Sequence, residues 1–494
     1  MSDERSITRR APESSRWSGG GAGAAVAPMI AAIAVAVVGL SRAGDNGYWF
    51  DEAVSAAVVR RTWSGMASVL TGQEAGMMPY YIALKSWAEL WPSDDGLRAF
   101  SVLGGAVAAG LLYGLARRWF DQVTAITSVV LLVTNPFFLR YLTEVRAYSW
   151  LFALGVATAW TVDLAHRTGR GRDVLVAAAC VGIGVATHLL FAVFAAATIW
   201  MLSTGRGDRR LPRRPLVLGA LLVMALVAPT IPAVIERSGQ LDWIGGFSFD
   251  TFVGQTQNLM GDGAVSLLLL CGLVVAGLVV LREPNRAAKL SVCVVVPSVF
   301  VIAVAAISLV RPIFVARYLA PALPMLAMAA AAGYTQLARR LLSSRRSIAV
   351  PVLICCAVLV LFIVDGPFSD DATGRNDARS AVAWMSERAT PDDRVAIGIE
   401  SLTNIGVLHY TDRSSVRDPG RLATADDTLY PLRRPALGYI DELAGAERMF
   451  LFLEPPAPIE RSLLEYAESL DVIELADFGS LRVVLLQIDT GGDS

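Results

Sequence analysis

Runs of about 20 apolar residues recur along this chain, and they restrict its fold more than any other feature. The run GAGAAVAPMIAAIAVAVVGL at 21–40 contains no charged residue. A helix of that length can cross a lipid bilayer. The chain is 54% hydrophobic and 18% charged, whereas soluble domains carry about 25% charged residues. The sequence therefore predicts an α-helical integral membrane protein.

Eleven segments are apolar enough to be predicted as spans. They are 24–41, 98–116, 122–139, 147–165, 174–188, 189–203, 215–235, 264–281, 290–310, 318–337 and 348–364. The fifth and sixth are short, and a pair of tilted or re-entrant helices around His188 is the alternative. The first run resembles a signal peptide, but no convincing small-residue cleavage site follows it. We therefore expect it to be an uncleaved anchor.

The distribution of basic residues predicts the orientation. Arginine is concentrated in the N-terminal segment 1–23 and in alternate short loops. Because cytoplasmic loops carry an excess of Lys and Arg, we expect a cytoplasmic N-terminus in a bacterial plasma membrane. Residues 365–494 then lie on the extracytoplasmic side. The first external loop, 42–97, contains two amphipathic stretches at 53–70 and 79–91 that are predicted to lie as helices in the interface.

Charged and polar residues gather on the predicted external face. Along the chain they are Asp51, Glu52, Glu144, Arg146, His188, Asp242, Arg311 and Arg317. Each has an ordinary structural interpretation as a helix cap, a local ion pair or a headgroup anchor. Together they suit transfer from a lipid phosphate, because arginine can hold a departing phosphate and a carboxylate can take the proton of an acceptor hydroxyl.

Four stretches, in this order, resemble the GT-C superfamily of polytopic glycosyltransferases that use polyprenyl-phosphate sugars. YWFDEAVS resembles the Asp-Glu motif of the family, and MMPYYIALKSW with LRAFSVLGG resembles its PPLYY…W…R-x-S segment. TEVRAYSW resembles E-A-R-x-Y, and RPIFVARYLAPALP resembles R-Y-L-x-P-x-x-P. The closest groups are protein mannosyltransferases and bacterial aminoarabinose transferases. Met77 and Met78 replace two common prolines, and Glu74 stands near the place where the family often has histidine.

The resemblance and the charged loops together imply roles for these residues. Asp51 is expected to be the general base, with Glu52 assisting it or orienting the acceptor. The other expected roles are donor-phosphate binding by Arg146, Arg311, Arg317 and Tyr318, support from Glu144, Tyr148 and His188, and contact with the acceptor by Glu74, Tyr80, Tyr81 and Asp242. No cofactor is firmly expected, and a divalent metal is the alternative, because an Asp-Glu pair suits either a base or a ligand.

The implied activity is inverting transfer of a single sugar, with mannose expected, to an envelope glycan, glycolipid or protein. The rival interpretations are a transporter or flippase of a lipid-linked precursor and a non-catalytic envelope scaffold. Transporters place ionisable residues near the middle of the membrane, whereas the centres of these spans are almost free of charge. The net charge of −1 gives no general attraction to nucleic acid.

Two structured regions are expected, a transmembrane catalytic domain at 24–364 and an extracytoplasmic α/β domain at 365–494. In the second region we predict helices near 376–389, 401–409 and 459–470. Strands are predicted at RVAIGI, MFLFLE and LRVVLLQID, and the alternation of the two element types favours an α/β fold. The five cysteines all lie in apolar runs, where a thiol behaves as a small hydrophobic group.

Overall fold

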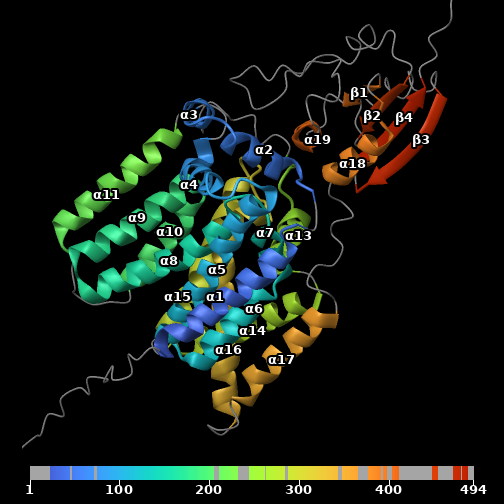
Figure 1. Cartoon of the computed structure of the whole chain (residues 1–494). Helices are drawn as coiled ribbons and strands as arrows, with labels where there is room; N and C mark the ends of the chain where they lie inside the picture. Colours follow the sequence, from blue (N-terminus) through green and yellow to red (C-terminus); the bar gives the residue numbers. More distant parts are fainter. Residues whose placement is uncertain are drawn as a thin grey trace, which may run out of the picture.

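The computed structural model describes a large helical bundle and a small sheet with two helices (Figure 1). The described residues are 23–44, 47–71, 75–204, 211–231, 244–261, 263–283, 287–342, 348–364, 377–390, 393–397, 403–410, 448–453, 471–479 and 481–487.

All eleven apolar segments contain helix. The helices are α1 (Gly23–Arg42), α5 (Asp94–Trp119), α6 (Gln122–Val133) with α7 (Pro136–Leu142), α8 (Tyr148–Thr168), α9 (Gly171–Thr187), α10 (Phe191–Thr204), α11 (Arg213–Val227) with η2 (Ala228–Thr230), α14 (Gly263–Arg282), α15 (Ala288–Ser308), α16 (Leu323–Leu341) and α17 (Ala349–Val364). Within the described residues, four helices are long and apolar enough to cross a membrane, or five if one bent pair forms a single span. The structure thus has several candidate membrane helices, and the total of eleven stays a prediction.

The bent pair is α6 and α7, which meet at an angle of 68°. Pro136 is the first residue of α7 and lacks the N–H that would continue α6. The side chain of Asn135 accepts a hydrogen bond from the backbone N–H of Phe138 (3.1 Å), so it caps a new helix. The predicted span at 122–139 is therefore two helices, and the second one ends close to the segment that carries Glu144 and Arg146.

The first loop forms short helices at one end of the bundle (Figure 1). They are α2 (Phe50–Val59), α3 (Trp63–Thr71), η1 (Ala75–Met77) and α4 (Met78–Ala88). The prediction of one helix at 53–70 is wrong, because the chain turns at 60–62, whereas the prediction at 79–91 is close to α4. Val58, Met66, Tyr81 and Leu84 are buried together in a small core of their own. The loop is thus a packed structure that can hold side chains in fixed positions.

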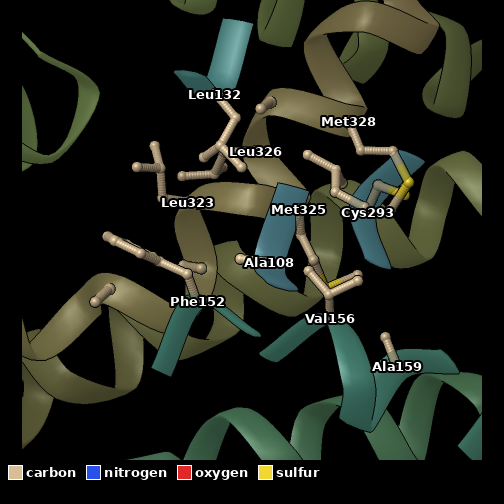
Figure 2. Packing of buried hydrophobic residues seen from close by; sticks show 14 of the residues in the cluster. Ala108, Leu132, Phe152, Val156, Ala159, Cys293, Leu323, Met325, Leu326 and Met328 are labelled. Carbon is tan, nitrogen blue, oxygen red and sulfur yellow. The ribbon is translucent and has the colours of Figure 1, made fainter. Parts of the chain in front are cut away.

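Helix α16 lies in the middle of the bundle, and small side chains allow its neighbours to approach closely. Its five alanines between 327 and 332 are fully buried, and small residues at helix contacts are typical of membrane bundles. Figure 2 shows Met325 beside Val156 and Met328 beside Cys293 in the surrounding core. Cys293 is buried and free, in agreement with its interpretation as a small hydrophobic residue.

Gly333 marks the closest approach between α16 and α14. A Cβ atom at Gly333 would lie 2.5 Å from the carbonyl oxygen of Gly272 and 2.9 Å from the backbone nitrogen of Ala276. We expect Gly333→Ala to lower the free energy of unfolding by about 1–3 kcal/mol through overpacking. The control is Gly277→Ala on α14, whose added methyl would have no atom within 4 Å. Thermal unfolding in detergent should separate the two variants, and an equal loss in both would contradict the close contact.

A buried carboxylate joins three helices near the opposite end of α8. Asp163 is fully buried, with Lys289 Nζ of α15 at 2.5 Å and Arg167 Nε of α8 at 2.8 Å. Arg118 Nε of α5 lies 3.6 Å from the same carboxylate. Because a buried charge requires charged or hydrogen-bonding partners, this cluster fixes the relative positions of α5, α8 and α15 far from Asp51.

The C-terminal region contributes a mixed four-stranded sheet of order β1-β2-β4-β3. Its elements are α18 (Ala378–Arg388), β1 (Arg394–Ile397), α19 (Thr403–Tyr410), β2 (Arg448–Leu453), β3 (Asp471–Phe478) and β4 (Leu481–Gln487). Strands β1 and β2 are parallel, and the other pairs are antiparallel. Phe450, Val483 and Leu485 pack against Ala381 and Met385 of α18. We call these six elements the C-terminal unit.

Most of the elements predicted in this region are present. Helices α18 and α19 and strands β1, β2 and β4 match the prediction, whereas β3 was not predicted and the helix expected at 459–470 lies outside the described residues. Strand β3 forms an edge of the sheet and is largely exposed. The polar residues of β3 therefore interrupt the continuous apolar run by which a buried strand is recognised in a sequence. The boundary at 365 stays a prediction.

Candidate active site

Asp51 and Glu52 occupy the first turn of α2, where acidic residues are favoured by the helix dipole. Both are buried, with 9% and 2% of their surfaces exposed. Because consecutive residues on a helix point about 100° apart, the two carboxylates meet different partners. The adjacent acids are therefore not equivalent in this structure.

Glu52 is held by Arg98 of α5. Arg98 Nε donates to Glu52 Oε1 and Nη2 donates to Oε2, both at 2.8 Å. The backbone N–H of Val145 also donates to Oε1 at 3.1 Å, and that of Trp49 donates to Oε2 at 3.4 Å. Arg98 further donates to the carbonyl oxygens of Ala43 (2.7 Å) and Gly47 (3.0 Å). This arrangement gives Glu52 the contacts of an anchor, which joins α2, α5 and the segment at 143–147.

Asp51 faces two arginines from distant parts of the chain. Arg146 Nη2 lies 3.7 Å from Asp51 Oδ1, and Arg317 Nη1 lies 3.4 Å from Oδ2. Arg317 belongs to η4 (Ala316–Ala322), which precedes α16. Both contacts are longer than the usual 2.7–2.9 Å of a charge-assisted hydrogen bond. The guanidinium groups therefore lie near the carboxylate without being tightly bound to it by these contacts.

Tyrosine and histidine rings surround the two arginines. Arg146 Nη1 donates to the hydroxyl of Tyr81 at 3.2 Å. The guanidinium of Arg317 lies 5.8 Å from the ring centre of Tyr318, and that ring lies 4.8 Å from the ring of His188. Tyr148 packs edge-on against Tyr141 at 4.8 Å. An aromatic ring whose centre lies within about 6 Å of a guanidinium group can stabilise that cation and fix its orientation.

Two further predicted residues lie within this region of the structure. Glu144 is buried in the turn that carries Arg146, and the backbone N–H of Arg146 donates to the carbonyl oxygen of Glu144 at 2.6 Å. Tyr80 is buried beside Tyr81, with ring centres 5.5 Å apart, and burial raises the pKa of Tyr80 above its ordinary value. Tyr80 therefore stays neutral at physiological pH.

Three predicted site residues remain, Glu74, Asp242 and Arg311. Glu74 and Asp242 lie outside the described residues, so their predicted acceptor roles are not tested. Arg311 is exposed, whereas Arg317 is largely buried. Within the described residues, no group of three or more His, Cys, Asp and Glu side chains is arranged to hold a metal ion.

Arg98 and Gln255 also shape this site, although neither has a role among those expected from the sequence. Arg98 lies in the quoted segment LRAFSVLGG, but its pairing with Glu52 spans 46 residues. Gln255 of α13 (Phe249–Met260) accepts a hydrogen bond from the backbone N–H of Ala316 at 2.8 Å, which fixes the residue before Arg317. Its only sequence signal is a position in a predicted external loop.

Comparisons with known proteins agree with the fold. Residues 76–232 match the family described as dolichyl-phosphate-mannose-protein mannosyltransferase, and no curated protein matches by sequence. The chain is 14% identical to ArnT from Cupriavidus metallidurans bound to undecaprenyl phosphate, with a TM-score of 0.57 over 96% of this chain and 100% of ArnT. For ArnT in the apo state the identity is 14% and the TM-score is 0.59, over 95% of this chain and 100% of ArnT.

A third similar structure is the oligosaccharyltransferase of Archaeoglobus fulgidus in complex with Zn and sulfate. It is 12% identical, with a TM-score of 0.50 over 87% of this chain and 67% of that protein. The family match covers part of the membrane region, and the fold shared with ArnT extends over nearly the whole chain. Together they agree, at the level of the fold and of the matched segment, with the resemblance to GT-C glycosyltransferases that the sequence motifs indicate.

Proposed function

We propose that this protein transfers a single sugar, with mannose as the expected one, from a polyprenyl-phosphate donor to an envelope acceptor on the extracytoplasmic side of the membrane. The observation that carries the proposal is the position of Asp51 between Arg146 and Arg317. This cluster provides a carboxylate for an acceptor proton beside two guanidinium groups for a phosphate. ArnT, which is similar in fold, has been solved with undecaprenyl phosphate bound.

The proposed reaction is an in-line displacement. Asp51 takes the proton of the acceptor hydroxyl, whose oxygen attacks the anomeric carbon. The bond from that carbon to the phosphate oxygen breaks, and polyprenyl phosphate leaves with the electron pair. Attack from the face opposite the leaving group inverts the anomeric configuration. The stoichiometry requires no oxidant and no second substrate beyond donor and acceptor.

Arg146 and Arg317 are proposed to bind the departing phosphate. Guanidinium groups donate paired N–H bonds to phosphate oxygens, and both of these groups lie beside the carboxylate that would take the acceptor proton. Tyr81 and Tyr318 would orient them through the contacts described above. In this assignment Tyr81 acts on the donor side, while Tyr148 and His188 support the arginines.

Glu52 is proposed to act through position. Each of its oxygens already accepts hydrogen bonds from Arg98 and from a backbone N–H. A carboxylate so occupied is poorly placed to take a proton from an acceptor. Its contribution is to fix the first turn of α2 and thereby the direction of Asp51.

The proposal is tested with the purified protein in vesicles and a panel of radiolabelled donors. The panel contains polyprenyl-phosphate mannose, polyprenyl-phosphate aminoarabinose and a nucleotide sugar, each with a crude envelope acceptor fraction. We expect transfer from one of the lipid donors and none from the nucleotide sugar. Transfer from the nucleotide sugar alone would contradict the proposal, and movement of an intact lipid-linked sugar across the bilayer without transfer would favour a transporter.

A further inference from the structure

The C-terminal unit contacts the segment that leads into α2. The hydroxyl of Tyr410, the last residue of α19, accepts a hydrogen bond from the backbone N–H of Tyr48 at 2.8 Å. Tyr48 is fully buried, and its own hydroxyl donates to the carbonyl oxygen of Asp94 at 3.0 Å. Burial, followed by the charge of Asp94, raises the pKa of Tyr410 to about 12. The hydroxyl therefore stays neutral across the physiological range.

His409 forms a second contact, at the other end of α2. Its Nδ1 lies 3.0 Å from Arg60 Nη1, and its Nε2 lies 3.1 Å from Asp94 Oδ1. A guanidinium group can only donate, so Nδ1 is the acceptor and Nε2 donates to Asp94. Arg60 is the C-cap of α2 and also pairs with Asp94 at 3.1 Å. The C-terminal unit thus touches both the residues before α2 and the residue that ends it.

Gly47 shows how closely the two surfaces fit. A Cβ atom at Gly47 would lie 2.7 Å from Asp377 Oδ1 and 3.0 Å from the backbone nitrogen of Arg379. Arg379 Nη1 donates to the carbonyl oxygen of Gly44 at 3.1 Å. No side chain larger than hydrogen fits at Gly47 unless α18 moves.

Gly47 and Tyr48 also contact Arg98, which pairs with Glu52 beside Asp51. The carbonyl oxygen of Gly47 accepts a hydrogen bond from Arg98 Nη2 at 3.0 Å. The guanidinium of Arg98 lies 4.9 Å from the ring centre of Tyr48, within the range of a cation–π contact. Arg98 in turn holds Glu52, the residue next to Asp51. A continuous series of contacts therefore runs from α19 through Tyr48 and Arg98 to the first turn of α2.

We infer that docking of α18 and α19 onto Gly44, Gly47 and Tyr48 positions Asp51, so that the C-terminal unit is part of the machinery that aligns the base. Tyr410 and His409 are the positioning residues of this surface. The kinetic consequence rests on the proposed function, whereas the docking itself does not. A misplacement of about 1 Å at a reacting group can reduce the rate about 100-fold, so even partial loosening of α2 is measurable.

The test compares Tyr410→Phe and Gly47→Ala with wild type. Tyr410→Phe keeps the ring and removes the oxygen that accepts the N–H of Tyr48. Gly47→Ala separates the surfaces without altering any side chain of the site. The control is Gly76→Ala in the same loop, whose added methyl meets no atom within 4 Å.

Two readouts are used on the full-length protein in vesicles. Amide hydrogen exchange over residues 47–55 is expected to quicken by about tenfold in both variants and to stay at the wild-type rate in Gly76→Ala. With the donor that supports transfer, kcat is expected to fall by about tenfold in both variants, with the donor KM within about twofold of wild type. A purely structural role would lower the amount of folded protein without this split between kcat and KM.

The two proposals fail in different ways. Unchanged exchange over 47–55 in both variants would overturn the docking inference, whatever the activity. Faster exchange with wild-type kcat would overturn the positioning role. If wild type transfers no sugar from any lipid donor, the proposed function fails and the exchange result alone decides whether the docking fixes α2.

Discussion

An Asp51→Asn variant is expected to transfer sugar about 10²- to 10⁴-fold more slowly than wild type, the usual contribution of a general base. The amide has nearly the same shape as the carboxylate and cannot take a proton from the acceptor hydroxyl. The initial rate of transfer from the lipid donor to the acceptor, measured on purified protein, checks this prediction.

In the same Asp51→Asn variant the donor KM is not expected to worsen along with the transfer rate. Removing the negative charge leaves Arg146 and Arg317 beside a neutral side chain, so the donor KM should stay equal or fall. Asp95→Asn is the control, because Asp95 is an exposed acid at the start of α5 and should be replaceable without loss of rate. A rate for Asp51→Asn equal to that of the control would eliminate Asp51 as the base.

The second large effect is expected at Arg98. Its side chain and that of Glu52 are 5% and 3% exposed, so Arg98→Met leaves a buried carboxylate without its cation. Breaking such a pair typically costs about 3–5 kcal/mol. We expect a loss of this size in the free energy of unfolding, measured by denaturant titration in detergent micelles.

Arg172→Met provides a matched control for Arg98→Met. Arg172 also pairs with an acid, Asp173, but the Arg172 side chain is 75% exposed. Asp173, whose side chain is 10% exposed, also accepts a hydrogen bond from Thr168, so we expect the loss of Arg172 to cost about 0–1 kcal/mol, as for exposed pairs. The double variant Glu52→Gln with Arg98→Met should recover part of the stability lost by Arg98→Met, because no buried charge remains. If Arg98→Met were no less stable than Arg172→Met, the anchor role of Glu52 would be wrong.

Much of the bundle could be predicted from the sequence because apolar length is a local property. Each apolar run contains a helix within a few residues of its predicted limits. The exceptions arise where one residue overrides the pattern. Pro136 breaks the run at 122–139 into α6 and α7, and the turn at 60–62 divides the predicted interfacial helix into α2 and α3.

The site was partly predictable. The charged residues of the external loops and their resemblance to a known family selected Asp51, Arg146 and Arg317, and the structure brings these three together. The sequence does not distinguish the surroundings of Asp51 from those of Glu52, because the difference depends on which helix faces each side of α2. The pairing with Arg98 decides it, and that pairing is a property of the tertiary structure.

The docking of the C-terminal unit was not predictable from local patterns. The contact between Tyr48 and Tyr410 joins residues 362 positions apart, and the contact between Asp94 and His409 joins residues 315 positions apart. Neither tyrosine nor histidine at the end of a short helix indicates its partner. Gly47 likewise has no sequence signal, because its small size matters only where α18 approaches.

If a sugar leaves a lipid phosphate at the Asp51 site, one lipid phosphate must be released for each sugar that reaches the acceptor, and counting both products tests the proposed mechanism. Purified wild type and Asp51→Asn are placed in vesicles with the radiolabelled donor chosen by the panel and an acceptor fraction. Labelled sugar in the acceptor and free polyprenyl phosphate are then counted together. The proposed mechanism predicts one polyprenyl phosphate released for each sugar transferred by wild type, and almost none of either with Asp51→Asn. Transfer without release of polyprenyl phosphate, or equal transfer by both proteins, would contradict it.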